Sequence, residues 1–160
     1  IIFILMAIEI ERKFLLRQSI TSITDKKGLL YIQGYLNESP ERTVRIRVAG
    51  DKAFLTVKGK SSGFTKQEFE YEIPVEDAKQ MLKLCENTPL EKIRYKIPYG
   101  SHIWEVDCFY GENEGLVLAE IELKSEDENF ERPDWVGDEV TSDKRYYNSY
   151  LSAHPYKTWK

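Results

Sequence analysis

The sequence predicts a mainly β protein built as a closed eight-stranded antiparallel barrel with a few flanking helices. Most of the 160-residue chain alternates between apolar and polar side chains with a period of two, which is typical of β-strands. Turn residues divide this alternation into eight runs, and one helical segment separates the fifth run from the sixth. A closed barrel is favoured over an open sheet because it leaves no unpaired strand edge exposed.

The first half of the chain contains five of these strands. They are expected at residues 7–17, 29–37, 43–49, 52–59 and 66–73. A tight turn at Gly50-Asp51 joins the third and fourth strands as a hairpin. The turn residues Ser61-Ser62-Gly63 lead into the fifth strand.

A single longer helix is expected at residues 75–87. Pro74 ends the strand alternation and suits the entrance to a helix. Beyond it, apolar residues recur at the spacing of one helix face: Val75, Ala78, Met81, Leu82 and Cys85. After Pro89 the alternation returns and predicts the last three strands at residues 91–98, 102–110 and 116–124.

The tail of the chain follows a different pattern. Residues 133–137, around Trp135, indicate an ordered turn, and Ser142 or Asp143 could cap a final helix at residues 144–152. The aromatic side chains of this tail are expected to pack over the barrel. A dimer contact and a lid over one mouth of the barrel are the alternatives.

The composition limits the function classes. A chain of this length with 41% hydrophobic and 31% charged residues fits one globular domain over residues 1–160. Its net charge of −4 argues against a nucleic-acid partner, which usually requires a basic face. Cys85 and Cys108 are too few for a disulfide framework or a zinc motif, and His102 and His154 are isolated.

The start of the chain is apolar over residues 1–8. This stretch is too short to span a membrane, and it lacks the basic region and cleavage site of a signal peptide. Met6 followed by Ala7 resembles an initiator, so residues 1–5 are expected to be an upstream extension. We therefore expect a cytoplasmic protein without a membrane partner.

The charged positions of the strands indicate the chemistry, because they separate by sign. The third, fourth and sixth strands place cations on one face, at Arg45, Arg47, Lys58, Lys92, Arg94 and Lys96. The first, fifth, seventh and eighth place mainly carboxylates there, at Glu9, Glu11, Glu68, Glu70, Glu72, Glu105, Asp107, Glu120 and Glu122. Such alternation commonly marks a solvated outer face. Like charges on one face repel, however, so this clustering favours an inward face that binds a polyvalent ligand.

An inward charged face predicts a phosphate and metal site. Arginine and lysine side chains could hold phosphoryl oxygens, and carboxylates could hold a hard divalent cation, Mg²⁺ or Mn²⁺ rather than zinc. Burying so much charge without a ligand would be costly, so the channel is expected to stay wet and to be stabilised by bound ions.

The order of the motifs resembles the CYTH superfamily of triphosphate tunnel metalloenzymes. Residues 9–13 match its E-x-E-x-K hallmark. Further similar segments follow in order, at residues 33–36 (Q-G-Y-L), 45–47 (R-x-R), 55–59, 68–74, 104–107, 118–123 and 145–148. The similarity covers about residues 6–152 and is strongest to the short bacterial branch, whose members are mostly triphosphatases that act on inorganic tripolyphosphate.

This resemblance implies metal-dependent hydrolysis of a triphosphate, most simply of inorganic tripolyphosphate to pyrophosphate and phosphate. It implies phosphoryl binding by Lys13, Arg45, Arg47, Lys58, Lys92 and Arg94. It implies metal binding by Glu9, Glu11, Glu120 and Glu122, with Glu70, Glu72 and Asp107 for a second metal or for water. The candidate catalytic residues are Lys13, Lys58, Glu70 and Tyr35.

Three other functions fit the same barrel. They are a class IV type adenylate cyclase, a thiamine triphosphatase, and a non-catalytic module that binds polyphosphate or an organic phosphate. A cyclase would need a surface that recognises the base, and the sequence does not identify one. A pure anion binder would gain nothing from the full carboxylate set. A homodimer is a further expectation.

Overall fold

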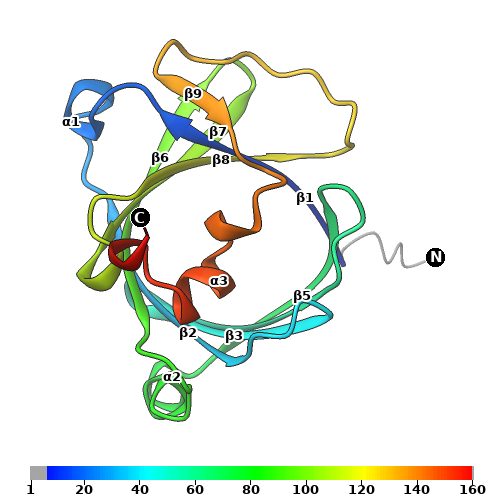
Figure 1. Cartoon of the computed structure of the whole chain (residues 1–160), viewed down its shortest axis with the longest axis vertical. Coiled ribbons are helices and arrows are strands. Elements are labelled where there is room, and N and C mark those ends of the chain that lie inside the picture. The colour runs from blue at the N-terminus through cyan, green and yellow to red at the C-terminus, as the bar shows by residue number, and fades with distance from the viewer. Residues whose placement is uncertain (1–6, 160) are drawn as a thin grey trace.

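The computed structural model describes residues 7–159, which form an antiparallel barrel closed on itself (Figure 1). Its strands are β1 (Ile8–Leu16), β2 (Leu29–Asn37), β3 (Arg42–Ala49), β4 (Lys52–Gly59), β5 (Thr65–Ile73), β6 (Leu90–Tyr99), β7 (His102–Tyr110) and β8 (Val117–Leu123). Around the barrel they follow the order β1, β5, β4, β3, β2, β6, β7, β8, and β8 pairs back with β1. The predicted fold class is confirmed. The expected upstream extension, residues 1–5, lies outside the described residues.

Strand β1 closes the barrel and also binds a ninth strand. One of its edges pairs with β8, while the other pairs first with β5, where Ile8 lies opposite Gln67. Farther along, this second edge pairs with β9 (Val136–Glu139). The expected turn at residues 133–137 is therefore partly a strand. Four residues are too few to show an alternation, and the strand forms because β5 leaves this part of β1 unpaired.

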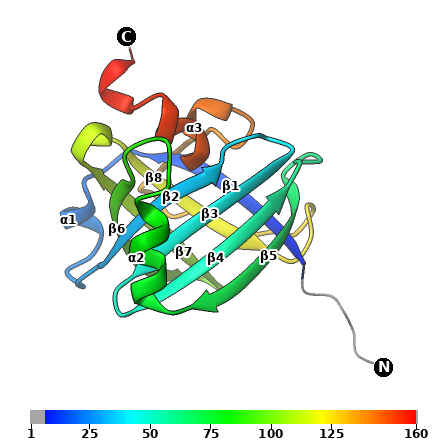
Figure 2. The same ribbon diagram turned by 90° about the horizontal axis from the view of Figure 1, so that it is seen from below.

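The apolar outer faces of the strands are covered, which allows the charged faces to turn inward. Helix α2 (Val75–Leu82) lies against the outside of β3 and β4 (Figure 2), and its Ala78 packs on Ile46 and Ala53. On the opposite side, Trp135 packs on the outward side chains of β1, β7 and β8. The tail was expected to pack over the barrel, and its first part does so, while α2 covers the outer face of β3 and β4.

Helix α2 is shorter than predicted, because it ends at Leu82 rather than at residue 87. The amides of Lys83, Leu84 and Cys85 donate to carbonyls three residues earlier, so the last turns tighten and the helix stops. Leu84 is 74% exposed, so no packing holds a longer helix in place. Within residues 7–159, no helix is long and apolar enough to cross a membrane.

The end of the chain closes one mouth of the barrel. The predicted helix at residues 144–152 is divided into a 3₁₀ turn (Lys144–Tyr146) and helix α3 (Asn148–Ala153). Helix α3 lies across the opening in Figure 1 and at the same end of the barrel in Figure 2. Its Leu151 is buried with inward side chains of four strands, Tyr35, Leu90, Phe109 and Leu118. Of the alternatives considered for the tail, a lid over one mouth of the barrel describes this segment. Helix α1 (Ile20–Ile23) is a short turn that the sequence did not predict.

Candidate functional site

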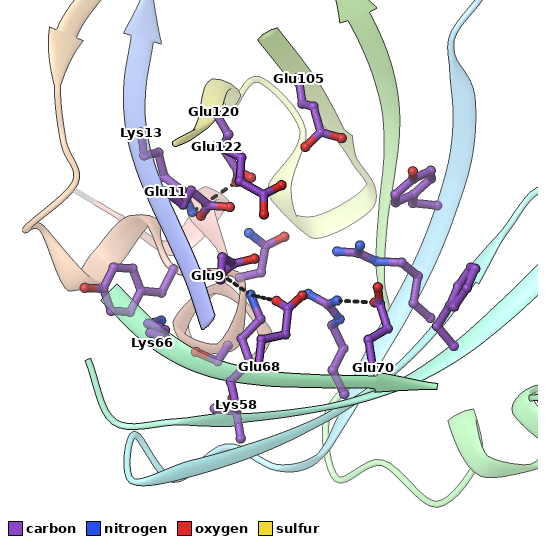
Figure 3. Close-up of a pocket in the computed structure, with 18 of the residues that line it drawn as sticks. Glu9, Glu11, Lys13, Lys58, Lys66, Glu68, Glu70, Glu105, Glu120 and Glu122 are labelled. Carbon is purple, nitrogen blue, oxygen red and sulfur yellow. Dashed lines mark hydrogen bonds and ion pairs between the residues drawn. The ribbon is translucent and has the colours of Figure 1, made fainter. Parts of the chain in front are cut away.

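The barrel encloses a cavity of about 330 Å³ that receives side chains from all eight strands. Because α3 and the apolar cluster fill one end, the cavity is a cup rather than an open channel. Its wall includes Glu11, Arg47 and Lys58, so the charged faces point inward as the sequence predicted. Figure 3 shows the side chains converging from opposite walls.

A group of carboxylates gathers where β1, β7 and β8 pair. Glu11 lies directly opposite Glu122, and Glu105 lies opposite Glu120 (Figure 3). Burial, together with the nearby charges of Glu120 and Glu9, raises the pKa of Glu11 well above its ordinary value. Glu11 forms no ion pair with any residue of 7–159. The cluster therefore brings together more carboxyl groups than its protein cations neutralise, and Glu11 holds its proton more strongly than an ordinary carboxyl, as expected for a site that a bound cation completes.

Lys58 links two carboxylates on the neighbouring wall. Its Nζ lies 2.8 Å from Glu9 Oε1 and 3.2 Å from Glu68 Oε2. Burial alone would raise the pKa of Glu9, but Lys58 and a hydrogen bond with Glu68 outweigh it, and the pKa falls to about 2. Burial and the neighbouring Glu9 raise the pKa of Glu68 to about 7. Near neutral pH this wall therefore holds one ionised carboxylate and one that can carry a proton.

The side chains of Arg45 and Glu70 both form hydrogen bonds with the buried hydroxyl group of Thr56. Thr56 Oγ1 donates to Glu70 Oε1 at 2.9 Å, and Arg45 Nη2 donates to Thr56 Oγ1 at 3.2 Å. Arg45 is 7% exposed, and its Nε has no hydrogen-bond partner among residues 7–159. Buried donors without a partner are costly, so this Nε is an unsatisfied donor in the wall of the cup.

A buried ion network forms the base of the cup. Lys92 Nζ lies 2.6 Å from Asp107 Oδ2, and Arg94 Nε lies 2.7 Å from Asp107 Oδ1. Burial would raise the pKa of Asp107, but Arg94 and Lys92 hold it below its ordinary value. Burial is the main cause that lowers the pKa of Lys92 to about 7. Arg94 also reaches Glu105 at 3.0 Å.

Two of the expected metal ligands do not fit their positions. Asp107 is fully buried beneath the cavity, and both of its carboxylate oxygens accept hydrogen bonds from Lys92 and Arg94. Glu72 shares a strand face with Glu70, but it lies near the end of β5, where it is exposed and outside the cavity wall. Asp107 therefore holds cations in place, and Glu72 lies apart from the site.

Two cations of the wall have no carboxylate partner among residues 7–159. Arg47 Nε donates to Gln33 Oε1 at 2.9 Å, and burial beside Arg45 and Arg94 lowers the pKa of Arg47 to about 10. Lys66 Nζ lies 4.4 Å from the ring centroid of Tyr147, and burial and nearby lysines lower its pKa. Unneutralised cations in a partly buried wall favour an anionic ligand.

The other predicted residues also line the cavity. Lys13 Nζ lies 3.3 Å from Glu120 and donates to the Tyr146 carbonyl at 3.0 Å. Tyr35 lines the cavity beside the apolar cluster, and its hydroxyl accepts a hydrogen bond from Gln33 at 3.4 Å.

The sequence did not single out several wall residues. Lys66 was the first residue of a predicted strand and alternates with Glu68, so the period of two could have identified it. Tyr147 and Asn148 come from the tail. Their motif resembled the family, but no local pattern shows that a tail segment enters a barrel.

The donor set fits a hard divalent cation, although no complete metal site is formed beforehand. Within residues 7–159, no three His, Cys, Asp or Glu side chains are arranged as a metal-binding group. Several carboxylates instead pair with lysine or arginine. Glu9, Glu11, Glu120 and Glu122 supply only oxygen donors from two strands, and Glu11 forms no ion pair with any residue of 7–159. Oxygen donors of this kind are the ligands that a hard divalent cation prefers.

Known proteins share both the sequence and the fold. The CYTH domain profile matches residues 7–152. An inorganic triphosphatase of Acetivibrio thermocellus is 51% identical over 157 residues, which cover 97% of this chain and 99% of that protein. An inorganic triphosphatase of Nitrosomonas europaea is 38% identical over 153 residues, with 90% and 96% covered. A solved inorganic triphosphatase structure has a TM-score of 0.64 and 35% identity, covering 90% of this chain and 93% of that one.

Proposed function

Because the chain belongs to the CYTH domain family, we propose that it hydrolyses inorganic tripolyphosphate to pyrophosphate and phosphate with the aid of a divalent metal ion. One observation carries this proposal: cations and carboxylates from seven of the eight barrel strands line a single cup of about 330 Å³. The cations complement the charge of a linear polyanion, and the carboxylates are suitable ligands for the metal ion that accompanies it. The relatives named inorganic triphosphatases, at 51% and 38% identity, support the same activity.

The cations of the cup would bind the triphosphate. Arg47 and Lys66 have no carboxylate partner among residues 7–159, so they can bind the anion without first breaking an ion pair. Arg45 also lines the cup, and its planar guanidinium suits phosphoryl oxygens. Lys13 and Lys58 would exchange carboxylate contacts for phosphoryl contacts and so offset the charge that develops on the leaving pyrophosphate. Lys92 and Arg94 would remain fixed by Asp107 at the base.

The carboxylates Glu9, Glu11, Glu120 and Glu122 would hold Mg²⁺ or Mn²⁺. A bound divalent cation neutralises phosphoryl charge and polarises the phosphorus centre. Glu70 is oriented by Thr56 and Arg45, so its carboxylate can accept a proton from an attacking water. Phosphoryl transfer depends mainly on positioning and charge, so a covalent intermediate is not required.

Purified protein tests the proposal directly. It is incubated with tripolyphosphate, ATP or thiamine triphosphate, each with Mg²⁺ or Mn²⁺, and phosphate, pyrophosphate and cyclic AMP are measured. We expect metal-dependent release of phosphate and pyrophosphate from tripolyphosphate, and near-complete loss in Lys58→Ala. Cyclic AMP as the main product from ATP would instead identify a cyclase. Binding of tripolyphosphate without turnover under any condition would identify a binding module.

The homodimer and the cytoplasmic location, which were expected from the sequence, stay predictions.

A further inference from the structure

Asn148, the first residue of α3, joins the tail to the base of the cup. Its side chain lines the cavity. Its Oδ1 accepts a hydrogen bond from Lys92 Nζ at 3.0 Å and another from Gln33 Nε2 at 3.1 Å. Gln33 is fully buried, and its own Oε1 accepts from Arg47 Nε at 2.9 Å. One tail residue thus connects Lys92 at the base of the cup with Arg47 in its wall, through Gln33.

These contacts determine which way the Asn148 amide points. A lysine ammonium can only donate, and Arg47 already occupies the Gln33 carbonyl, so Gln33 Nε2 must donate as well. Asn148 therefore turns Oδ1 toward both donors. Its Nδ2 then lies on the other side of the planar amide, and no residue among 7–159 accepts a hydrogen bond from it. Two N–H groups remain for a ligand in the cavity.

We propose that Asn148 donates a hydrogen bond from Nδ2 to a phosphoryl oxygen of the bound triphosphate, which makes the tail part of the binding site. This inference rests on the proposed function. It assigns to the site a neutral donor from outside the barrel strands. A hydrogen bond to a charged oxygen is among the stronger ones, particularly in a cavity with little water.

A purely structural role for Asn148 leads to a different expectation. In that case its only task is to anchor α3 through Oδ1 to Lys92 and Gln33. Asn148→Asp keeps an acceptor of the same shape for both anchoring donors, and it adds attraction to Lys92. It also replaces the two N–H groups with a carboxylate oxygen that repels phosphate. The aspartate variant therefore separates anchoring from substrate binding.

The same helix provides a matched control. Ser152 is buried, and its Oγ donates to Glu38 Oε1 at 3.1 Å, away from the cavity wall. Ser152→Ala removes one tail anchor without touching the cup. The experiment measures KM and kcat for tripolyphosphate with saturating metal, and thermal unfolding, in the wild type and in Asn148→Asp, Asn148→Ala and Ser152→Ala.

We expect Asn148→Asp to raise KM about 10-fold or more, at an unfolding temperature close to that of the wild type. Asn148→Ala is expected to raise KM by less, and it carries the test if the aspartate variant does not fold. Ser152→Ala is expected to keep KM within about twofold while losing some stability. An unchanged KM in the folded Asn148 variants, with a lower unfolding temperature, would overturn the inference. A wild type that does not hydrolyse tripolyphosphate would instead refute the proposed function.

Discussion

Glu11 shows how a single residue can be unfavourable for stability and necessary for the proposed activity. It lies inside the barrel opposite Glu122, with Glu120 and Glu9 nearby and no ion-pair partner among residues 7–159. A buried, uncompensated carboxylate costs free energy of folding. In the proposed site, a metal ion supplies the missing positive charge.

Glu11→Gln is therefore expected to separate activity from stability. Tripolyphosphatase activity should fall about 100-fold or more, because an amide is a poorer ligand for a hard cation. The unfolding temperature of the metal-free protein should not fall, because a neutral amide replaces a buried carboxyl that has no ion-pair partner among residues 7–159. Steady-state kinetics and thermal unfolding measure the two effects.

Glu72→Gln is the matched comparison for Glu11→Gln, because Glu72 is exposed and lies outside the cavity. We expect near-wild-type activity in this variant. A large loss there would return Glu72 to the metal site, and a wild-type rate in Glu11→Gln would remove Glu11 from it.

The ion pair that fastens β9 gives a pH-dependent prediction. Glu139 accepts hydrogen bonds from Arg12 Nε at 2.9 Å and from Thr141 Oγ1 at 2.6 Å. The hydrogen bond to Arg12 is the main cause that lowers the pKa of Glu139. A carboxylate with a lowered pKa stabilises the fold above its unfolded pKa, and this contribution disappears as the pH falls through its folded pKa.

Glu139→Gln should accordingly reduce the free energy of unfolding at pH 7 by about 0.5–1 kcal/mol. The difference from the wild type should shrink as the pH drops below about 4, where the wild-type carboxylate also becomes neutral. Urea titrations at several pH values measure it. Glu131→Gln, in the same segment and exposed, serves as the control. A difference that grows on acidification would contradict the assignment.

At the scale of the elements, the sequence predicted what depends on short-range periodicity. The alternation of β2, β4 and β7 was enough to place both ends of each strand. It also separated inward from outward residues, because the side-chain period of a strand is two. The end of α2 was missed because its last turns tighten where Leu84 has no packing partner, and β9 was missed because it depends on a strand distant in sequence.

The sequence also placed those site residues that lie on regular strands, because the same alternation separates inward from outward side chains. Charged strand residues such as Glu11, Arg47 and Lys58 line the cup as expected. The positions of Asp107 and Glu72 depended on depth along the barrel, which the alternation does not report. Asn148 depended on where the tail closes the barrel, and no local pattern carries that information.

A close approach between α2 and β2 explains why a glycine lies at position 34. A Cβ at Gly34 would come within 2.7 Å of Cys85 Sγ and 3.3 Å of Leu82 Cδ2. Gly34→Ala should therefore reduce stability by about 1–3 kcal/mol through overpacking, even though alanine suits a strand better than glycine.

A double variant tests this cause. In Gly34→Ala with Cys85→Ala, the sulfur is gone, so part of the lost stability should return, and the two changes should be non-additive. Denaturant unfolding of both single variants and the double variant measures the coupling. Additive effects would show that contact with Cys85 is not the reason.

At the scale of the whole molecule, the barrel reverses the usual distribution of side chains, with apolar clusters outside the strands and charged groups inside them. Its outward faces form the apolar clusters under α2 and Trp135, while its interior is charged except at the end closed by α3. The network of Lys92, Arg94 and Asp107 keeps cations in place without a ligand. The remaining cations and carboxylates are only partly neutralised by each other, so a ligand of matching charge should stabilise the fold.

Ligand binding should therefore raise the unfolding temperature. A ligand at 100 times its dissociation constant contributes about 2.7 kcal/mol, and for a protein of this size 1 kcal/mol corresponds to about 2–4 °C. Tripolyphosphate with metal is thus expected to raise the unfolding temperature by about 5–10 °C, measured in a scan that is short compared with turnover. Orthophosphate at the same concentration should raise it much less, since it spans fewer of the cations.

In Glu11→Gln the increase that depends on metal should disappear, whereas the part due to the anion alone should persist, because Arg47 and Lys66 are intact. An equal shift with orthophosphate would show that the cup does not recognise the length of the triphosphate.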